Sequence, residues 1–164
     1  MKFFSLLLLI AVTDCSLAQT PKIQVVAYSR ITTPGIPTDP EGPANNRFPV
    51  RYYIYLTVKK GTPVSVSSVC LKRQSYAASL KKVTSPVVVP HDLNVPTEVK
   101  DMLVPETQDD VYQVNVQEQT APACEDRAQL LARDNEVVVA LKSGATTLYA
   151  PAKTIAALPA AAAP

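Results

Sequence analysis

The sequence predicts an all-β protein, an antiparallel immunoglobulin-like β-sandwich of about 7–8 strands that follows a signal peptide. Short segments alternate between apolar and polar residues, turns with proline or glycine separate them, and only one short segment has helical spacing. We favour a sandwich over a closed barrel because prolines interrupt several strands, which suits two sheets with open edges. The chain contains no tryptophan, so this resemblance concerns architecture alone.

The first residues have the order of a secretory signal. Lys2 precedes an apolar run from Phe3 to Val12, and small side chains at Ser16 and Ala18 lie where a signal peptidase cuts. The run of about 10 residues is too short to span a bilayer, which needs about 20. We therefore expect cleavage after Ala18, no transmembrane span in the mature chain, and a periplasmic or secreted protein.

A lipoprotein anchored through Cys15 is the alternative. Val12 fits the lipoprotein pattern at the third position before the cysteine, whereas Asp14 occupies the position where a small residue is expected. Both readings place the mature protein outside the cytoplasm.

The first two strands are expected in KIQVVAYSRI and RYYIYLTVKK. Alternation places Ile23, Val25 and Ala27 on the core face of the first. In the second, it predicts a half-buried strand with an aromatic outer row. Its buried face carries Tyr52, Ile54, Leu56 and Val58, and its outer face carries Arg51, Tyr53, Tyr55, Thr57 and Lys59.

In the third expected strand, GTPVSVSSVCLKR, the apolar residues switch from one face of the strand to the other. Val64 and Val66 share one face, whereas Val69 and Leu71 share the opposite one. The switch at Ser67–Ser68 predicts a β-bulge or a strand that crosses between two sheets.

Four later segments have strand patterns, and one short segment has helical spacing. KKVTSPVVV is interrupted by Pro86 and TEVKDMLVP is bounded by prolines, so both suit sheet edges. VYQVNVQEQ alternates, with Tyr112, Val114 and Val116 inward, and NEVVVALKSGATTLYAP predicts a hairpin turned at Ser143–Gly144. Between them, CEDRAQLLARDN offers one or two helical turns, too short to be stable alone.

Without Cys15, two cysteines remain, Cys70 and Cys124. An even pair in an exported chain predicts a disulfide. Closing a loop of about 55 residues stabilises by about 4 kcal/mol in the chain-entropy model. Two separate buried thiols are the alternative, and a metal site is not expected because two cysteines and a distant histidine form no ligand set.

The chain is expected to divide into a signal peptide (1–18), a β-sandwich domain (19–152) and a flexible Ala/Pro-rich tail (153–164). The mature part of about 146 residues is long enough to bury the core of one domain. The tail IAALPAAAAP is uncharged and interrupted by proline, so we expect it to fray.

Composition and motifs argue against most chemistries. The net charge is only +2 and no basic stripe carries interleaved aromatics, so nucleic acid is not expected as a partner. The sequence has no G-x-S-x-G elbow and no glycine-rich phosphate cradle, and we predict no cofactor and no catalytic residue. His91 is the single histidine, and a small hydrolase that uses His91 remains the second alternative.

The most suggestive side chains are Arg51, Tyr53 and Tyr55 on one strand face. Tyrosine and arginine are enriched at protein interfaces, and two neighbouring rings also suit a sugar. Cross-strand packing is the competing explanation. The sequence thus predicts an exported, non-catalytic module that has a structural role or binds a protein in the bacterial cell envelope, through this face or an exposed sheet edge. A carbohydrate-binding module with an exposed tyrosine face is the alternative.

Overall fold

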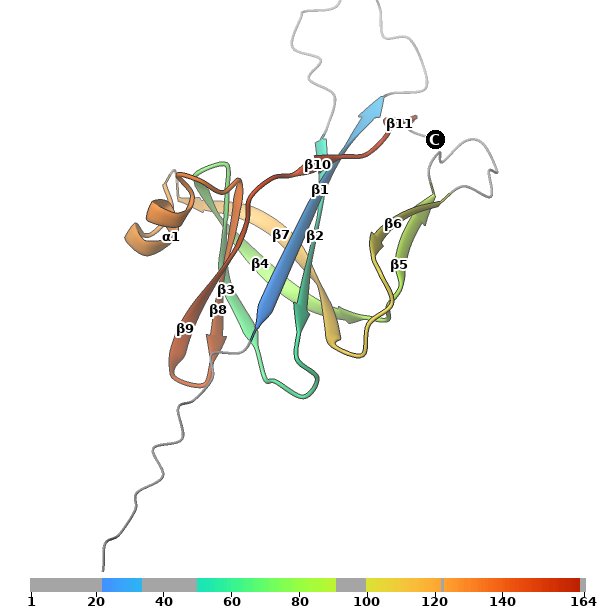
Figure 1. Ribbon diagram of the computed structural model, residues 1–164. Helices are drawn as coiled ribbons and strands as arrows, with labels where there is room; N and C mark the ends of the chain where they lie inside the picture. The colour runs from blue at the N-terminus through green and yellow to red at the C-terminus, as the bar shows by residue number, and fades with distance from the viewer. Residues whose placement is uncertain (1–21, 34–49, 91–99, 122, 163–164) are drawn as a thin grey trace, which may run out of the picture.

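The computed structural model describes residues 22–33, 50–90, 100–121 and 123–162. The predictions that concern the signal peptide, Cys15 and His91 lie outside these residues. The described chain is mostly β-strand, which confirms the predicted all-β class. Its sheets comprise one curled sheet of nine strands and a separate pair, β5 with β6 (Figure 1).

The order of elements follows the sequence pattern closely. The strands before the helix are β1 (Ile23–Thr33), β2 (Val50–Val58), β3 (Ser65–Leu71), β4 (Gln74–Val83), β5 (Val87–Pro90), β6 (Lys100–Val104) and β7 (Asp110–Ala121). The helix α1 (Asp126–Leu131) precedes β8 (Val137–Ser143), β9 (Thr146–Ala152), β10 (Ala156–Ala157) and β11 (Ala161–Ala162). The predicted hairpin β8–β9 is present. Its turn residues are Gly144 and Ala145, one position later than predicted, with φ of 60° at Gly144.

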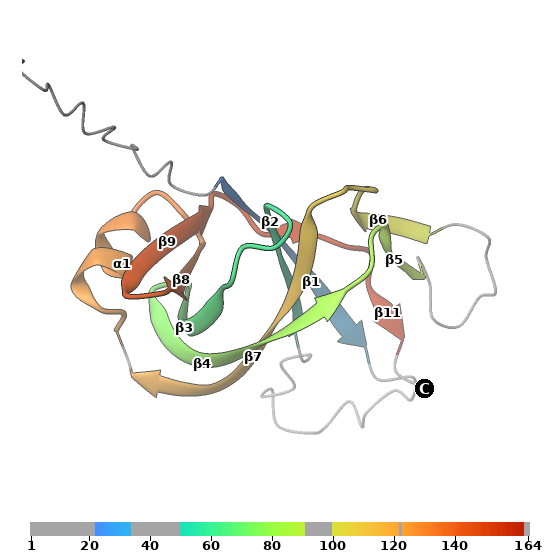
Figure 2. The ribbon, with the colours of Figure 1, turned by 90° about the horizontal axis from the view of Figure 1, so that it is seen from below.

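The large sheet curls so that β1, near one end, packs beside β9 at the other end without pairing with it. Its strand order is β10-β1-β2-β7-β4-β3-β8-β9, and β11 pairs with β1 beside this path. All pairs are antiparallel except those of β1 with β10 and β11. Figure 2 shows the long strands β4 and β7 curving across the molecule, and register shifts near Tyr76 in their ladder permit such a bend.

The main core fills the inside of the curl. Ile54, Leu56 and Val58 are fully buried, which confirms the predicted inner face of β2. The predicted inner faces of β1 and β7 also contribute to this cluster, together with β3, β8 and β9. Burying such side chains is worth about 1.5–3 kcal/mol each, so period-two alternation determines which face of each strand turns inward.

The phase change in β3 is a bulge, as the sequence predicts. The ladder between β3 and β8 pairs Val66 with Leu141 but Ser68 with Ala140, so Ser67 has no partner in the register. The Ser67 hydroxyl donates to the carbonyl of Ala140 at 3.1 Å. Because of this extra residue, valines on both sides of the bulge reach the same core.

The β5–β6 hairpin covers the outer face of β1, β2 and β7. Leu103 and Val104 of β6 form a second buried cluster with Tyr55 and Val111. The Tyr28 hydroxyl donates to the Leu103 carbonyl at 2.8 Å. The prediction that Tyr55 is exposed is therefore wrong, since only 4% of it is accessible. Alternation assigns Tyr55 to the outer face, but it does not reveal that a later hairpin folds over that face.

The C-terminal segment lies along β1. Ala156–Ala157 and Ala161–Ala162 pair with β1 in parallel, and the Leu158 amide donates to the Ser29 carbonyl at 2.8 Å. The sequence predicts a frayed tail over 153–164, whereas the tail as described pairs with a sheet edge. Backbone hydrogen bonds need no apolar side chains, so composition does not reveal this pairing.

Candidate functional site

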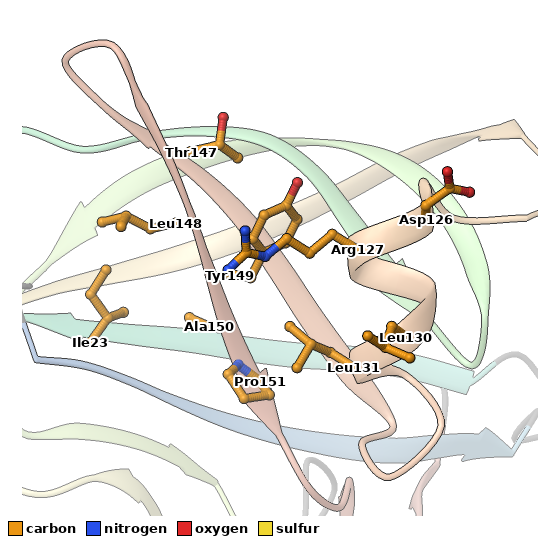
Figure 3. A pocket seen from close by; sticks show the side chains of 10 residues that line it. All are labelled: Ile23, Asp126, Arg127, Leu130, Leu131, Thr147, Leu148, Tyr149, Ala150 and Pro151. Carbon is orange, nitrogen blue, oxygen red and sulfur yellow. The ribbon is translucent and has the colours of Figure 1, made fainter.

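A groove of about 820 Å³ opens beside α1 and β9 (Figure 3). One wall is α1 and the floor is the outer side of β9, while β1 contributes Ile23 at the far end. Most lining groups are apolar, and a few polar groups lie among them, as in many binding sites. The lining residues are Ile23, Asp126, Arg127, Leu130, Leu131 and the strand residues Thr147 to Pro151.

A disulfide holds α1 against the sheet. Cys70 of β3 and Cys124, two residues before α1, are bonded as the sequence predicts, with their Cα atoms 5.7 Å apart. Beneath the helix, Ala128 and Ala132 form a buried cluster with Val138 and both cysteines. A helix of 6 residues is too short to be stable alone. Its position therefore depends on this cluster and the covalent bond.

The end of α1 is completed by nearby polar groups. The Asn135 side-chain amide donates to the Leu131 carbonyl at 2.8 Å, and the Ala132 amide donates to the Ala128 carbonyl. These bonds satisfy carbonyls that a helix end otherwise leaves open. Leu130 is 58% exposed, and its side chain lines the groove. Leu130 therefore adds exposed apolar surface to the helix side of the groove.

Tyr149 is held in position at the middle of the groove. Its hydroxyl donates to a Glu125 carboxylate oxygen at 3.1 Å, and the Arg127 guanidinium lies 5.6 Å from the ring centroid. Desolvation, followed by the hydrogen bond to Glu125 and its charge, raises the pKa of Tyr149. The phenol therefore stays protonated near neutral pH and acts as a donor.

The outer edge of β9 pairs with no further strand in the part of the chain that the structure describes, although β1 packs beside part of it. β9 is the last strand of the sheet and pairs only with β8. Ser143 and Thr146 close the hairpin turn, and hydrogen bonding alternates from there. The amides of Thr147 and Tyr149 consequently point away from β8, and Pro151 at the next such position has no N–H. The edge thus offers a short run of backbone donors and acceptors that an extended peptide can satisfy.

The site residues predicted from the sequence lie elsewhere. Arg51 is exposed, Tyr53 is half-buried and Tyr55 is buried, so the three do not form an open face. Arg51 and Tyr53 line a different hollow of about 530 Å³. Burial raises the pKa of Tyr55, and the neighbouring tyrosines Tyr53 and Tyr28 contribute less. A binding role for Arg51 and Tyr53 remains a prediction.

The groove residues were not predicted, although the sequence contains a signal for them. In CEDRAQLLARDN the helical stripe is Ala128, Leu131 and Ala132, which leaves Leu130 beside the stripe as an apolar residue without a buried partner. Among the described residues, no group of three His, Cys, Asp or Glu side chains is placed to hold a metal ion. Across the same ranges, no helix is long and apolar enough to span a membrane.

The fold and the site together define a disulfide-bonded all-β protein with a partly apolar groove beside an open strand edge. No protein-family model, no curated protein and no solved structure matches this chain.

Proposed function

We propose that this chain is an exported, non-catalytic β-sandwich that has a structural role or binds a protein in the bacterial cell envelope. The Cys70–Cys124 disulfide supports an oxidising compartment. The opening Phe3–Val12 run and the small residue Ala18 support export through a cleaved signal, with a lipid anchor at Cys15 as the alternative.

The strand order supports an immunoglobulin-like sandwich. One layer is β1-β2-β7-β4 and the other is β3-β8-β9, which corresponds to the A-B-E-D and C-F-G orders of immunoglobulin constant domains. Residues Gln74–Tyr76 of β4 pair with β3, and residues Ser75–Val83 of β4 pair with β7. On this proposal, β4 links the two layers and gives the sheet its continuous curl.

The open edge of β9 beside the groove is the observation that carries the binding proposal. An extended segment of a partner protein adds to β9 through the backbone of Thr147 and Tyr149. Its alternate side chains reach Leu130 and Leu131 on one face. Pro151 limits the paired stretch, as prolines at strand edges commonly do. An unpaired β-edge selects an extended partner because a helix satisfies its own backbone groups.

A pull-down from the envelope fraction tests this function. Leu130→Asp places a charge where the partner's apolar side chain would lie, and Gln129→Asp is the matched control, since Gln129 is exposed on the same helix outside the groove. We expect a captured protein to be lost with Leu130→Asp and retained with Gln129→Asp. Equal capture by both variants, or no specific capture by the natural chain, contradicts the proposal.

The position of the tyrosine side chains argues against the alternative of a carbohydrate-binding module. It needs an open tyrosine face, and Tyr55 is only 4% exposed beneath β6. A glycan array with the natural chain and Tyr53→Ala still tests it directly. A small hydrolase would depend on His91, which lies outside the described residues.

A further inference from the structure

The C-terminal tail is seated on the outer edge of β1, at the opposite end of the strand order from β9. Ala156 and Ala157 pair with Tyr28 and Ser29, and further along β11 pairs with Thr32–Thr33. Figure 1 shows the tail running along this strand after it leaves β9. The tail shows what kind of segment the β1 edge accepts, namely an extended backbone with small side chains.

The tail is held by few interactions. Each ladder with β1 contains two residue pairs, and both are parallel, a geometry slightly less stable per residue than antiparallel pairing. Ala156 and Ala157 are exposed, and alanine offers little side-chain area for packing. Pro159 interrupts the paired stretches and cannot donate a backbone hydrogen bond.

One side chain anchors the tail. Leu158 is half-buried against the cluster beneath β6, which also contains Tyr28 and Tyr53. Its amide is the donor to the Ser29 carbonyl. Ile155, the residue directly before β10, is fixed separately. Its backbone amide donates a hydrogen bond to the Glu136 carboxylate, and its side chain contacts the main core. The tail can therefore pivot directly after Ile155. Its departure leaves the main core packed and removes only the contact of Leu158 with the cluster beneath β6.

We propose that the β1 edge from Tyr28 to Thr33 is an acceptor site for an extended, small-residue segment of a partner protein that carries one leucine-sized side chain. The chain's own tail occupies this site and is displaced when such a segment binds. This site is separate from the groove beside β9, and it stands or falls independently of the proposed function there.

The tail competes with a partner segment for the β1 edge, and its covalent attachment keeps it close to this site. A segment on a short tether has an effective concentration in the millimolar range. A free peptide therefore binds only to the fraction of molecules whose edge is vacant, and its apparent affinity falls in proportion to that fraction. Weakening the tail must strengthen the binding of an added peptide, which a purely structural tail would not do.

The test uses the full chain and a fluorescent peptide of residues 155–164. Leu158→Asp in the chain removes the apolar anchor, and Leu158→Met is the matched control that keeps it. We expect the peptide to bind Leu158→Asp at least about tenfold more tightly than it binds the natural chain or Leu158→Met, measured by fluorescence anisotropy. A peptide that itself carries Leu158→Asp should bind none of the three chains.

Amide shifts on peptide addition give the location, and they should concentrate on Tyr28–Thr33. If Leu158→Asp unfolds the protein, Leu158→Ala replaces it with the same expected direction. A dimer between the natural chain and Leu158→Asp also supports the site, with the tail of a second copy as the partner segment. Equal peptide affinity for all chains, or shifts confined to other strands, overturns the proposal.

Discussion

Arg30 is, within the described ranges, the one charged side chain that is buried, with 3% exposed. Its Nη2 atom donates to an Asp101 carboxylate oxygen at 3.1 Å, and its Nε atom has no hydrogen-bond partner among the described residues. A buried cation is tolerated only when a partner compensates it. This ion pair thus joins β6 to β1 and helps to hold the hairpin over Tyr55.

Asp101→Ala should lower the free energy of unfolding by about 3 kcal/mol, because it removes the carboxylate that compensates Arg30. Denaturant unfolding provides the measurement. The double variant Arg30→Met with Asp101→Ala should recover part of this loss, since it buries no uncompensated charge. A double variant that is less stable than Asp101→Ala contradicts this explanation of the pair.

The contacts of Asp110 should make the stability of the fold sensitive to acid. Lys82 donates to it at 2.7 Å and the Gly61 amide at 3.1 Å. The hydrogen bond from Lys82 first, and that from Gly61 second, lower the pKa of Asp110 below its usual 3.8. A lowered folded-state pKa contributes stability above the unfolded pKa, and this contribution disappears as pH falls through the folded pKa.

We therefore expect the natural chain to lose stability below about pH 4 more steeply than Asp110→Asn. Thermal unfolding midpoints between pH 2.5 and pH 7 measure the difference. Parallel profiles for the two chains would show that the contacts of Asp110 do not affect folding.

Among the elements, α1 depends most on the disulfide. Cys70 and Cys124 are 54 residues apart in the chain. The fully buried part of the cluster under the helix contains small side chains and Val138, with the partly buried Leu131 and Tyr149 packed against it. Replacing both cysteines by alanine should cost about 2–4 kcal/mol of stability. It should also raise hydrogen exchange in α1 more than in β2. Unchanged exchange in α1 would mean that the helix is held without the bond.

The sequence predicted the positions of the strands better than it predicted which parts of the chain pack over their faces. Alternation identified β1, β2, β7 and the β8–β9 hairpin, and the switch between Val66 and Val69 located the bulge. Periodicity reports which side chains share a face, because it reflects burial on one side of a strand. It contains no information on which distant element folds over that face, so the β5–β6 cover of Tyr55 was missed.

The groove beside α1 and β9 was missed for a related reason. It combines Ile23 with Leu130 and Tyr149, residues that are far apart in the chain. Only the curl of the sheet and the disulfide bring them to one surface. The exposed apolar side chain of Leu130 was the single local indication.

At the scale of the whole molecule, both ends of the curled sheet present backbone edges. Among the residues that the structure describes, the β9 edge pairs with no strand beyond β8 and adjoins the groove, whereas the β1 edge is covered by the tail. Proteins usually protect such edges because they attract other strands. Here Pro151 limits the first and Pro159 interrupts the cover of the second, which suits controlled pairing with a partner better than open-ended association.

Site-specific photo-crosslinking in cells that produce the protein is the sharpest test of strand docking at β9. A photoreactive residue replaces Thr147 on the outer edge of β9, and in the control it replaces Lys81, which is exposed on β4 in the middle of the sheet. We predict a discrete crosslinked protein from position 147 and none from position 81, with loss of the product when Leu130→Asp is added. No product from position 147, or the same product from both positions, would contradict strand docking at this edge.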